Sequence, residues 1–466
     1  MGSSSVWFSL SFPQNVGILA PRNSLKSVES GFPGTSFLPS RFFPNGRIRV
    51  GFLNQAKLLR RAEVSPFDFE PPPIDHDLQD AMVALGAETL EDGSVETFGN
   101  DELALEAVEE GVAVVDLSHF GRIRVTGEDR INYLHNQSTA NFQSLGEGQG
   151  CDTVFVTPTA RTIDIAHAWV MKNSVLLHVS PETCSSIIDM LNRYIFFSDK
   201  VEVQDLTKTT CFFTLMGPKS SEVISNLNLS DLLGKPYGTH HHYSVRKTGL
   251  SLQFCCLKAC SQISEGAICW LLYGITLYIL QHLLVNKAPV TVGVGSVLSE
   301  EGFSLLLTPA NAEPVWKALL TLGAVPMGTK GWERLRVLRG RPAPAKELTD
   351  EYNVLEACLW KAISLNKGCY KGQETIARLV TYDGVKQKLW GIHLDGPAEP
   401  GSAITVNGKK VGMLTSYSAG SREPKHAGLG YVKRQACTAG LEVVIGDAVG
   451  TLVDVPFLIQ QPEKTE

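Results

Sequence analysis

The chain has 466 residues and a net charge of −6, with 43% hydrophobic and 19% charged residues. This length exceeds what one hydrophobic core usually serves, so we expect two or three domains of ~100–200 residues each. The acidic balance argues against nucleic acid as the principal partner, because binding phosphates needs a surplus of lysine and arginine. Ten cysteines without paired CxxC spacing argue against a disulfide scaffold and a zinc site, so no bound metal is expected.

The first 60 residues differ in composition from the rest of the chain. They are rich in serine, phenylalanine and proline, and they contain seven lysines and arginines but a single acid, Glu29. They lack the ~7–15-residue apolar core of a secretory signal. We interpret residues 1–60 as a chloroplast transit peptide, with a mitochondrial transit peptide and a disordered tail as the alternatives. Residues 61–99 are expected to form a linker and an N-terminal extension.

Residues 100–244 are expected to form a first α+β domain. The spacing of apolar residues predicts helices over 101–109 and 128–134, and apolar runs predict strands over 121–125 and 174–179. Short strands and helices that alternate in this way are typical of an α+β layer arrangement.

Residues 245–285 interrupt this pattern with an apolar segment in which four cysteines cluster. Residues 267–285 of this segment approach the ~20-residue length of a membrane helix, yet we do not expect a membrane partner. Removing it joins residues 240–244 to 286–290 and restores an uninterrupted strand region. In addition, Val245-Arg246 can be the translation of a splice-donor consensus. We therefore interpret the block as a translated retained intron; a membrane anchor and a genuine loop insertion are the alternatives.

Residues 286–384 return to the α+β pattern, with strands predicted over 290–294 and 303–307 and a helix over 312–322. Residues 385–458 are predicted to be all-β. They contain a hairpin over 403–412 with an Asn-Gly turn, and a further strand over 441–445, so a small C-terminal β-barrel is expected.

The segment K-G-C-Y-K-G-Q-E at residues 367–374 carries the clearest chemical signal. It places the thiol of Cys369 between two lysines in a glycine turn, and a helix is predicted to begin at Gln373. Neighbouring ammonium groups and a helix N-terminus both favour the thiolate. The alternative is a glycine turn that contains a small, half-buried cysteine.

This octapeptide resembles the K-G-C-Y-x-G-Q-E signature of the YgfZ family, folate-binding proteins related to the glycine-cleavage T-protein (aminomethyltransferase). Residues 335–342 and 353–357 resemble the family's L-R-x-x-x-G-x-P and N-P-L-E-A segments. Residues 116–120 and 125–129 are similar to the opening D-x-S-H and V-x-G-x-D elements of the T-protein. The resemblance implies two ferredoxin-like α+β domains around a central folate channel, with a C-terminal β-barrel. It also implies tetrahydrofolate as the cofactor.

The resemblance also indicates site residues. Glu300 lies where the T-protein has the pterin-binding glutamate of E-D-G-F, and Arg336 matches the arginine of L-R-x-x-x-G. Asp164 lies where the T-protein carries the catalytic aspartate of G-G-x-x-D-D, but both glycines and one aspartate are absent here, which argues against aminomethyl transfer. The expected catalytic residues are Cys369, Lys367 and Asp164. The expected cofactor-binding residues are Glu300, Arg336, Tyr370, Gln373, Glu374 and Arg378.

Two functions follow from the resemblance. The first is a tetrahydrofolate-dependent factor in iron–sulfur cluster biogenesis or repair, which acts on client iron–sulfur proteins in the chloroplast stroma. The second is a folate-dependent one-carbon transferase that acts on a small molecule. The intact octapeptide and the incomplete aspartate site favour the first.

Overall fold

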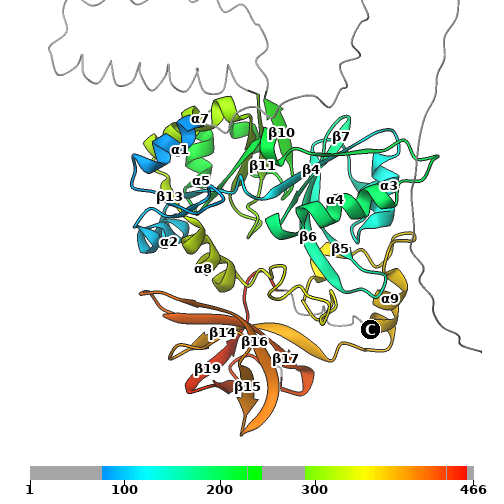
Figure 1. Ribbon diagram of the computed structural model, residues 1–466, viewed down its shortest axis with the longest axis vertical. Coiled ribbons are helices and arrows are strands. Elements are labelled where there is room, and N and C mark those ends of the chain that lie inside the picture. Colours follow the sequence, from blue (N-terminus) through cyan, green and yellow to red (C-terminus); the bar gives the residue numbers. More distant parts are fainter. Residues whose placement is uncertain (1–75, 228, 244–288, 437, 459–466) are drawn as a thin grey trace, which may run out of the picture. The chain divides into compact units, whose positions relative to one another are not determined.

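The computed structural model describes residues 76–227, 229–243, 289–436 and 438–458 (Figure 1). The expected transit peptide and the 245–285 block lie outside these residues. In the described part, no helix is long and apolar enough to cross a membrane.

An antiparallel five-stranded sheet forms the first layer, with strand order β5-β6-β7-β4-β8. Its strands are β4 (Gly121–Thr126), β5 (Gln149–Val156), β6 (Thr162–Val170), β7 (Ser174–Val179) and β8 (Glu202–Asp205). The helices α3 (Arg130–Gln137) and α4 (Cys184–Arg193) cover one face of this sheet. Leu134 of α3 and Leu191 of α4 pack there against Ile123 and Phe155, and all four side chains are fully buried.

A six-stranded sheet forms the second layer, with strand order β10-β11-β12-β9-β3-β13. Its strands are β3 (Ala113–Asp116), β9 (Cys211–Met216), β10 (His240–Tyr243), β11 (Val290–Val294), β12 (Phe303–Leu307) and β13 (Val325–Met327). Only the pairing of β13 with β3 is parallel. The sheet thus takes strands from both sides of the 245–285 block, and the domain boundaries expected from sequence stay a prediction.

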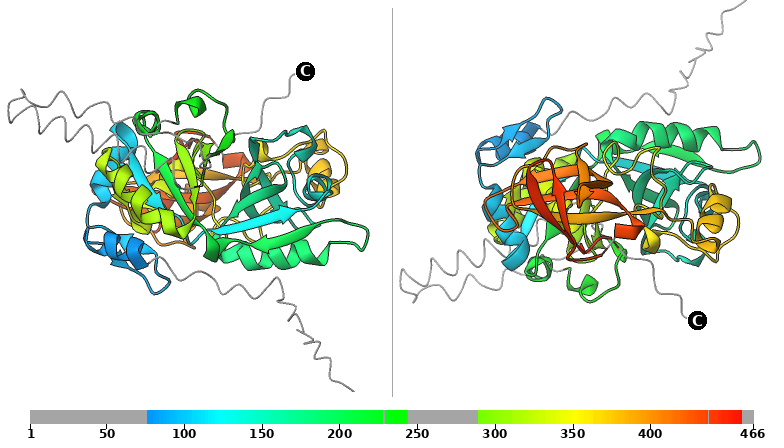
Figure 2. Two further views of the ribbon diagram at one scale, coloured as in Figure 1. Left: turned by 90° about the horizontal axis from the view of Figure 1, so that it is seen from above. Right: turned by 90° about the horizontal axis from the view of Figure 1, so that it is seen from below.

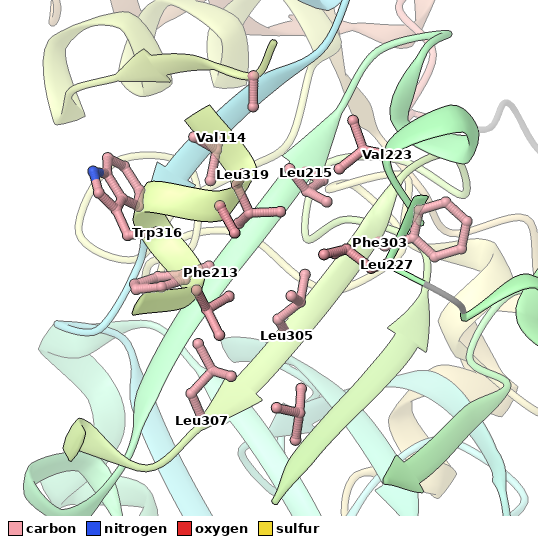
Figure 3. Packing of buried hydrophobic residues seen from close by; sticks show 14 of the residues in the cluster. Val114, Phe213, Leu215, Val223, Leu227, Phe303, Leu305, Leu307, Trp316 and Leu319 are labelled. Carbon is pink, nitrogen blue, oxygen red and sulfur yellow. The ribbon is translucent and has the colours of Figure 1, made fainter. Parts of the chain in front are cut away.

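Three helices cover one face of the six-stranded sheet: α1 (His76–Val83), α5 (Ser220–Asn226) and α7 (Pro309–Thr321). Figure 3 shows Trp316 and Leu319 of α7 beside Phe213 and Leu305 of the sheet. On the other face, α2 (Asp101–Glu110) and α8 (Thr329–Arg339) share a buried cluster with Phe212. Trp169 of the five-stranded sheet belongs to the same cluster, so the two sheets meet there.

The C-terminal segment closes into a barrel of six strands, in the order β14-β17-β16-β15-β18-β19 (orange to red in Figures 1 and 2). Its strands are β14 (Gln387–Leu394), β15 (Ala403–Val406), β16 (Lys409–Ala419), β17 (His426–Lys433), β18 (Glu442–Ile445) and β19 (Ala448–Val453). The predicted hairpin is confirmed as β15 and β16. Its turn residues Asn407 and Gly408 have φ of 49° and 74°, the positive values that a tight hairpin turn requires.

The remaining elements are short. A two-stranded ribbon of β1 (Glu88–Thr89) and β2 (Val95–Thr97) precedes α2, and α9 (Gln373–Thr381) follows the octapeptide. The short 3-10 helices are η1 (Phe142–Ser144), η2 (Pro181–Thr183), η3 (Thr207–Thr209), η4 (Ser230–Leu232), η5 (Trp360–Ala362) and η6 (Arg434–Ala436). The expected α+β architecture with a C-terminal barrel is therefore confirmed.

The strands on either side of the 245–285 block pair directly with one another. Strands β10 and β11 are antiparallel neighbours, with Tyr243 opposite Val290. Deleting residues 245–285 leaves Ser244 and residues 286–289 to connect the two strands, and connections of about five residues are common in hairpins.

We expect the chain without residues 245–285 to fold and to unfold within a few degrees of the full-length chain, because the pairing of β10 with β11 is kept. Circular dichroism during heating of the two proteins checks this. A deletion variant without a cooperative transition would show that the block contributes to the fold.

Candidate functional site

A cavity of about 470 Å³ combines apolar walls with a few charged groups. It is lined by residues from β5, β6, the loop between β11 and β12, the end of α8 and the segment around η5. Ile165, Leu298, Leu359 and Phe457 supply apolar surface. The volume lies in the range of ~300–1,000 Å³ that is typical of small-molecule sites.

Asp152 is the least exposed of the carboxylates that line this cavity. It lies on β5, directly across from His167 on β6. His167 Nδ1 donates to Asp152 Oδ1 at 2.8 Å, and the Tyr237 hydroxyl donates to the same oxygen at 2.8 Å. The indole N–H of Trp169 donates to His167 Nε2 at 2.8 Å. Because Nε2 accepts this bond, the proton of neutral His167 lies on Nδ1 and faces Asp152.

The contacts of Asp152 keep its carboxyl group ionised. Burial by itself raises the pKa of this carboxyl, but the bonds from His167 and Tyr237 and the charge of Arg341 outweigh burial and hold the pKa below its ordinary value. Burial raises the pKa of the Tyr237 hydroxyl, which therefore remains a donor at neutral pH. Both donors use Oδ1, so Oδ2 is left to other partners.

Charged side chains lie where the cavity meets solvent. Glu300 Oε1 accepts a bond from Lys361 Nζ at 2.6 Å, and these side chains are 64% and 65% exposed. Arg339, at the end of α8, adds a second cation. Glu300, which we expected to bind the pterin, therefore does line the cavity, but it is already paired with a lysine.

The chemistry of these groups fits tetrahydrofolate. A pterin ring is planar and has a donor edge that resembles guanidine, so it requires apolar walls and an acceptor carboxylate. The glutamate tail is anionic and requires cations. Among the lining residues, Asp152 is a carboxylate of this kind, and Arg339 and Lys361 are cations of this kind.

A second cavity of about 470 Å³ is more strongly charged. Glu333 and Lys346, two of its lining residues, form an ion pair with each other at 2.6 Å. The first cavity has more extensive apolar walls beside its charged groups, as small-molecule sites usually do, so it is the better candidate site.

Arg336, expected to bind the cofactor, is instead enclosed by the protein. It is 5% exposed, and its bonds occupy all five N–H donors of the guanidinium group. The acceptors are Glu333, Glu347, the Arg341 carbonyl and the Ser416 hydroxyl. This network connects α8 to β16 and leaves no N–H group for a ligand. The network holds α8 against the barrel, and a role for Arg336 in cofactor binding stays a prediction.

Asp164, expected to be catalytic, is also enclosed. It is 1% exposed and is not among the residues that line the cavity. Its two oxygens accept bonds from the Ser180 N–H and hydroxyl, the Thr183 hydroxyl and the Ile165 N–H. Burial raises its pKa despite these bonds. These contacts tie β6 to the segment that precedes α4, and a catalytic role for Asp164 stays a prediction.

Lys367 of the octapeptide binds the end of α3. Its Nζ donates to the carbonyls of His135, Ser138 and Ala140 at 2.5, 2.6 and 2.7 Å, and it lies 4.6 Å from the centre of the Tyr370 ring. Burial lowers the pKa of Lys367 to about 7. The three carbonyls oppose this shift, because only the ammonium form has three protons to donate. Lys367 thus closes the C-terminus of a helix, where cations are favoured.

Cys369 is an exposed free cysteine. It lies in the turn between Lys367 and Lys371, and both lysines contact the end of α3. The backbone N–H of Lys371 donates to the Asn136 carbonyl at 3.0 Å, and its Nζ lies 4.6 Å from the centre of the Tyr194 ring. Gly372 has a φ of +83°, and a Cβ at this position would lie 2.8 Å from Val156. The turn is therefore fixed by its backbone, and the helix α9 begins at Gln373 as predicted.

The other expected cofactor-binding residues lie around this turn and do not line the cavity. Tyr370 is 8% exposed, and burial raises its pKa to about 12. Gln373 Nε2 donates to the Lys367 carbonyl at 3.5 Å. Glu374 and Arg378 form an exposed ion pair at 2.5 Å. Their roles in folate binding stay predictions.

Asp152, His167, Tyr237 and Arg339 were not singled out from the sequence. Strand alternation could have indicated one of them, since Asp152 is a single acid in the otherwise uncharged strand β5. The other three meet Asp152 or the cavity only through long-range contacts, which no local pattern reveals.

The GCVT N-terminal domain family matches residues 91–265. A chloroplastic protein of Arabidopsis thaliana, named "putative transferase", is 57% identical over 418 residues, with 89% of this chain and 88% of that protein covered. An aminomethyltransferase of Rubrobacter xylanophilus is 25% identical, with 76% of this chain and 84% of that protein covered. The crystal structure of the glycine cleavage system aminomethyltransferase T from Bartonella henselae matches with a TM-score of 0.64 at 16% identity. The structural match covers 83% of this chain and 98% of the Bartonella henselae chain, so the two proteins share the same fold.

Proposed function

The chain belongs to the GCVT-domain family, which is related to the aminomethyltransferases, and from this premise we propose that it is a tetrahydrofolate-binding plastid protein that supports iron–sulfur cluster biogenesis or repair. The cavity around Asp152 carries the folate part of this proposal. The exposed Cys369 in a YgfZ-type octapeptide carries the iron–sulfur part.

The folate part rests on the match between cavity and ligand. Asp152 offers an ionised acceptor among apolar side chains, and Arg339 and Lys361 offer cations for the glutamate tail. Within this site the residues of the chain would bind and orient the folate and exclude water from its ring. The folate itself would supply one-carbon chemistry when bound.

The iron–sulfur part rests on an accessible thiol in a rigid turn. Cys369 is exposed, while Lys367 and Lys371 bind the end of α3 and fix the turn around it. Among the described residues, no group of three or more His, Cys, Asp or Glu side chains could hold a metal ion. A cluster delivered or repaired here would be cargo, with further ligands from a client protein or a small thiol.

A plastid location is supported by the serine-rich N-terminal composition and by the chloroplastic relative. Both observations favour client proteins in the stroma over those in the mitochondrion.

The second candidate is a folate-dependent one-carbon transferase that acts on a small molecule. The aminomethyltransferase relatives favour it. The surroundings of Asp164 count against it, because this carboxylate already accepts four hydrogen bonds and does not line the cavity. We therefore rank the iron–sulfur role first.

Cells that lack the protein are expected to lose activity of iron–sulfur enzymes and to keep glycine cleavage. The Cys369→Ser variant should fold and bind tetrahydrofolate but fail to restore these enzymes, since a hydroxyl does not ionise near neutral pH. Complementation followed by assays of iron–sulfur enzymes checks this. Asn366→Ser, at a nearby exposed position, is the control and should restore activity. Full complementation by Cys369→Ser, or a defect in glycine cleavage alone, would contradict the iron–sulfur role.

A further inference from the structure

We propose that Asp152, and not Glu300, is the carboxylate that binds the donor edge of the pterin, its 2-amino group and ring N–H. This inference rests on the proposed folate binding and assigns a recognition residue to it. Asp152, His167 and Tyr237 form one hydrogen-bonded unit beside the cavity, and the proposal makes this unit the selective part of the site.

The backbone fixes the position of Asp152. It lies within β5, and the adjacent strand β6 places His167 directly opposite. Side chains that are held by strand pairing move less than side chains on loops, and a ligand site benefits from such rigidity. Glu300 lies instead in the loop between β11 and β12.

The hydrogen bonds around Asp152 use only one of its two carboxylate oxygens, and Asp152 lines the cavity. His167 and Tyr237 both donate to Oδ1, so Oδ2 keeps its capacity to accept a ligand N–H. Trp169 binds the far nitrogen of His167 and thereby fixes the tautomer that donates to Asp152. Each member of the chain Trp169, His167, Asp152 thus orients the next one.

Burial distinguishes the two candidate carboxylates. The side chain of Asp152 is 23% exposed, whereas that of Glu300 is 64% exposed and already paired with Lys361. Water screens an exposed charge and competes for its hydrogen bonds, so exposed pairs discriminate weakly between ligands. A charge-assisted bond to the sheltered Asp152 is stronger.

The distribution of charge also gives the ligand a direction. The carboxylate of Asp152 is the more sheltered charge, at 23% exposed, and Lys361 is the more exposed one, at 65%. A molecule with a cationic or N–H-rich ring at one end and an anionic tail at the other matches this order. The pterin would therefore lie at Asp152, and the glutamate tail at Lys361 and Arg339.

Calorimetry on the full-length protein tests the assignment with two probes, tetrahydrofolate and p-aminobenzoylglutamate, which lacks the pterin. Asp152→Asn should weaken tetrahydrofolate binding about 10- to 100-fold and leave p-aminobenzoylglutamate binding unchanged. Glu442→Gln, an exposed acid on the barrel, is the matched control and should change neither. Tyr237→Phe, which keeps the carboxylate but removes one of its donors, should produce a smaller loss for tetrahydrofolate alone.

A ligand-side test avoids any dependence on how the variants fold. A tetrahydrofolate analogue without the 2-amino group should bind the wild-type protein at least tenfold more weakly than tetrahydrofolate. Equal affinity for the two ligands would overturn the role of Asp152. A loss in Glu300→Gln with none in Asp152→Asn would return the role to Glu300. If the wild-type protein binds no tetrahydrofolate, the proposed folate function itself fails, and this outcome is distinct from the other two.

Discussion

Replacing Arg336 by methionine is expected to lower the free energy of unfolding by about 3–5 kcal/mol. The guanidinium group is 5% exposed, and its partner Glu347 is fully buried. Removing the cation leaves the Glu347 carboxylate in the interior without its charged partner, which costs more than the original pair contributed. The bonds to Glu333, Ser416 and the Arg341 carbonyl are lost as well. Urea-induced unfolding of the variant and the wild type measures the difference.

Arg339→Met is the matched control, on the same helix and with the same change of side chain. Arg339 lies at the cavity and is only half-buried, so we expect its replacement to change the free energy of unfolding by less than about 1 kcal/mol. It should weaken binding of the folate tail instead. Equal stability of the two variants would show that the Arg336 network contributes little, and a selective loss of folate binding in Arg336→Met would support the predicted role of Arg336 in cofactor binding.

The secondary structure could largely be predicted from the sequence. The strands expected over 174–179, 290–294 and 303–307 coincide with β7, β11 and β12. Each of these strands is a short run of mainly apolar residues that ends at a turn or at polar residues. Such local patterns predict strands without knowledge of the tertiary structure. The helix expected over 312–322 begins at Pro309 instead, because Thr308 and Pro309 form a start signal that apolar spacing alone does not register.

The site was harder to predict, because the same residue type can serve folding or function. Arg336 and Asp164 match positions of functional residues in a related family, yet here their side chains are occupied by protein partners. Those partners are distant in sequence, as with Arg336 and Ser416 on β16. Conversely, Asp152 carries no motif and becomes a candidate only once β5 and β6 pair. Sequence patterns identify chemistry that is available, whereas the tertiary structure decides which groups remain accessible.

The octapeptide illustrates this division within a single motif. Its lysines were expected to lower the pKa of the thiol, but Lys367 donates to three carbonyls at the end of α3 and is 8% exposed. Cys369, two residues away, is exposed. One residue of the motif therefore holds the fold and another is available for chemistry. Whether Lys367 also acts on the thiol stays a prediction.

Lys367→Met should separate these two roles. Methionine fills the space of the lysine stem but donates no hydrogen bond, so three buried carbonyls lose their partner and we expect the free energy of unfolding to fall by about 3–5 kcal/mol. Cys369→Ser, at an exposed position, should stay within about 0.5 kcal/mol of the wild type. Chemical denaturation of both variants checks the first effect, and the rate of thiol alkylation in folded Lys367→Met checks whether the lysine also activates Cys369. An unchanged stability in Lys367→Met with much slower alkylation would make Lys367 an activating residue, since a purely structural lysine lowers stability and leaves the thiol of the folded protein as reactive as before.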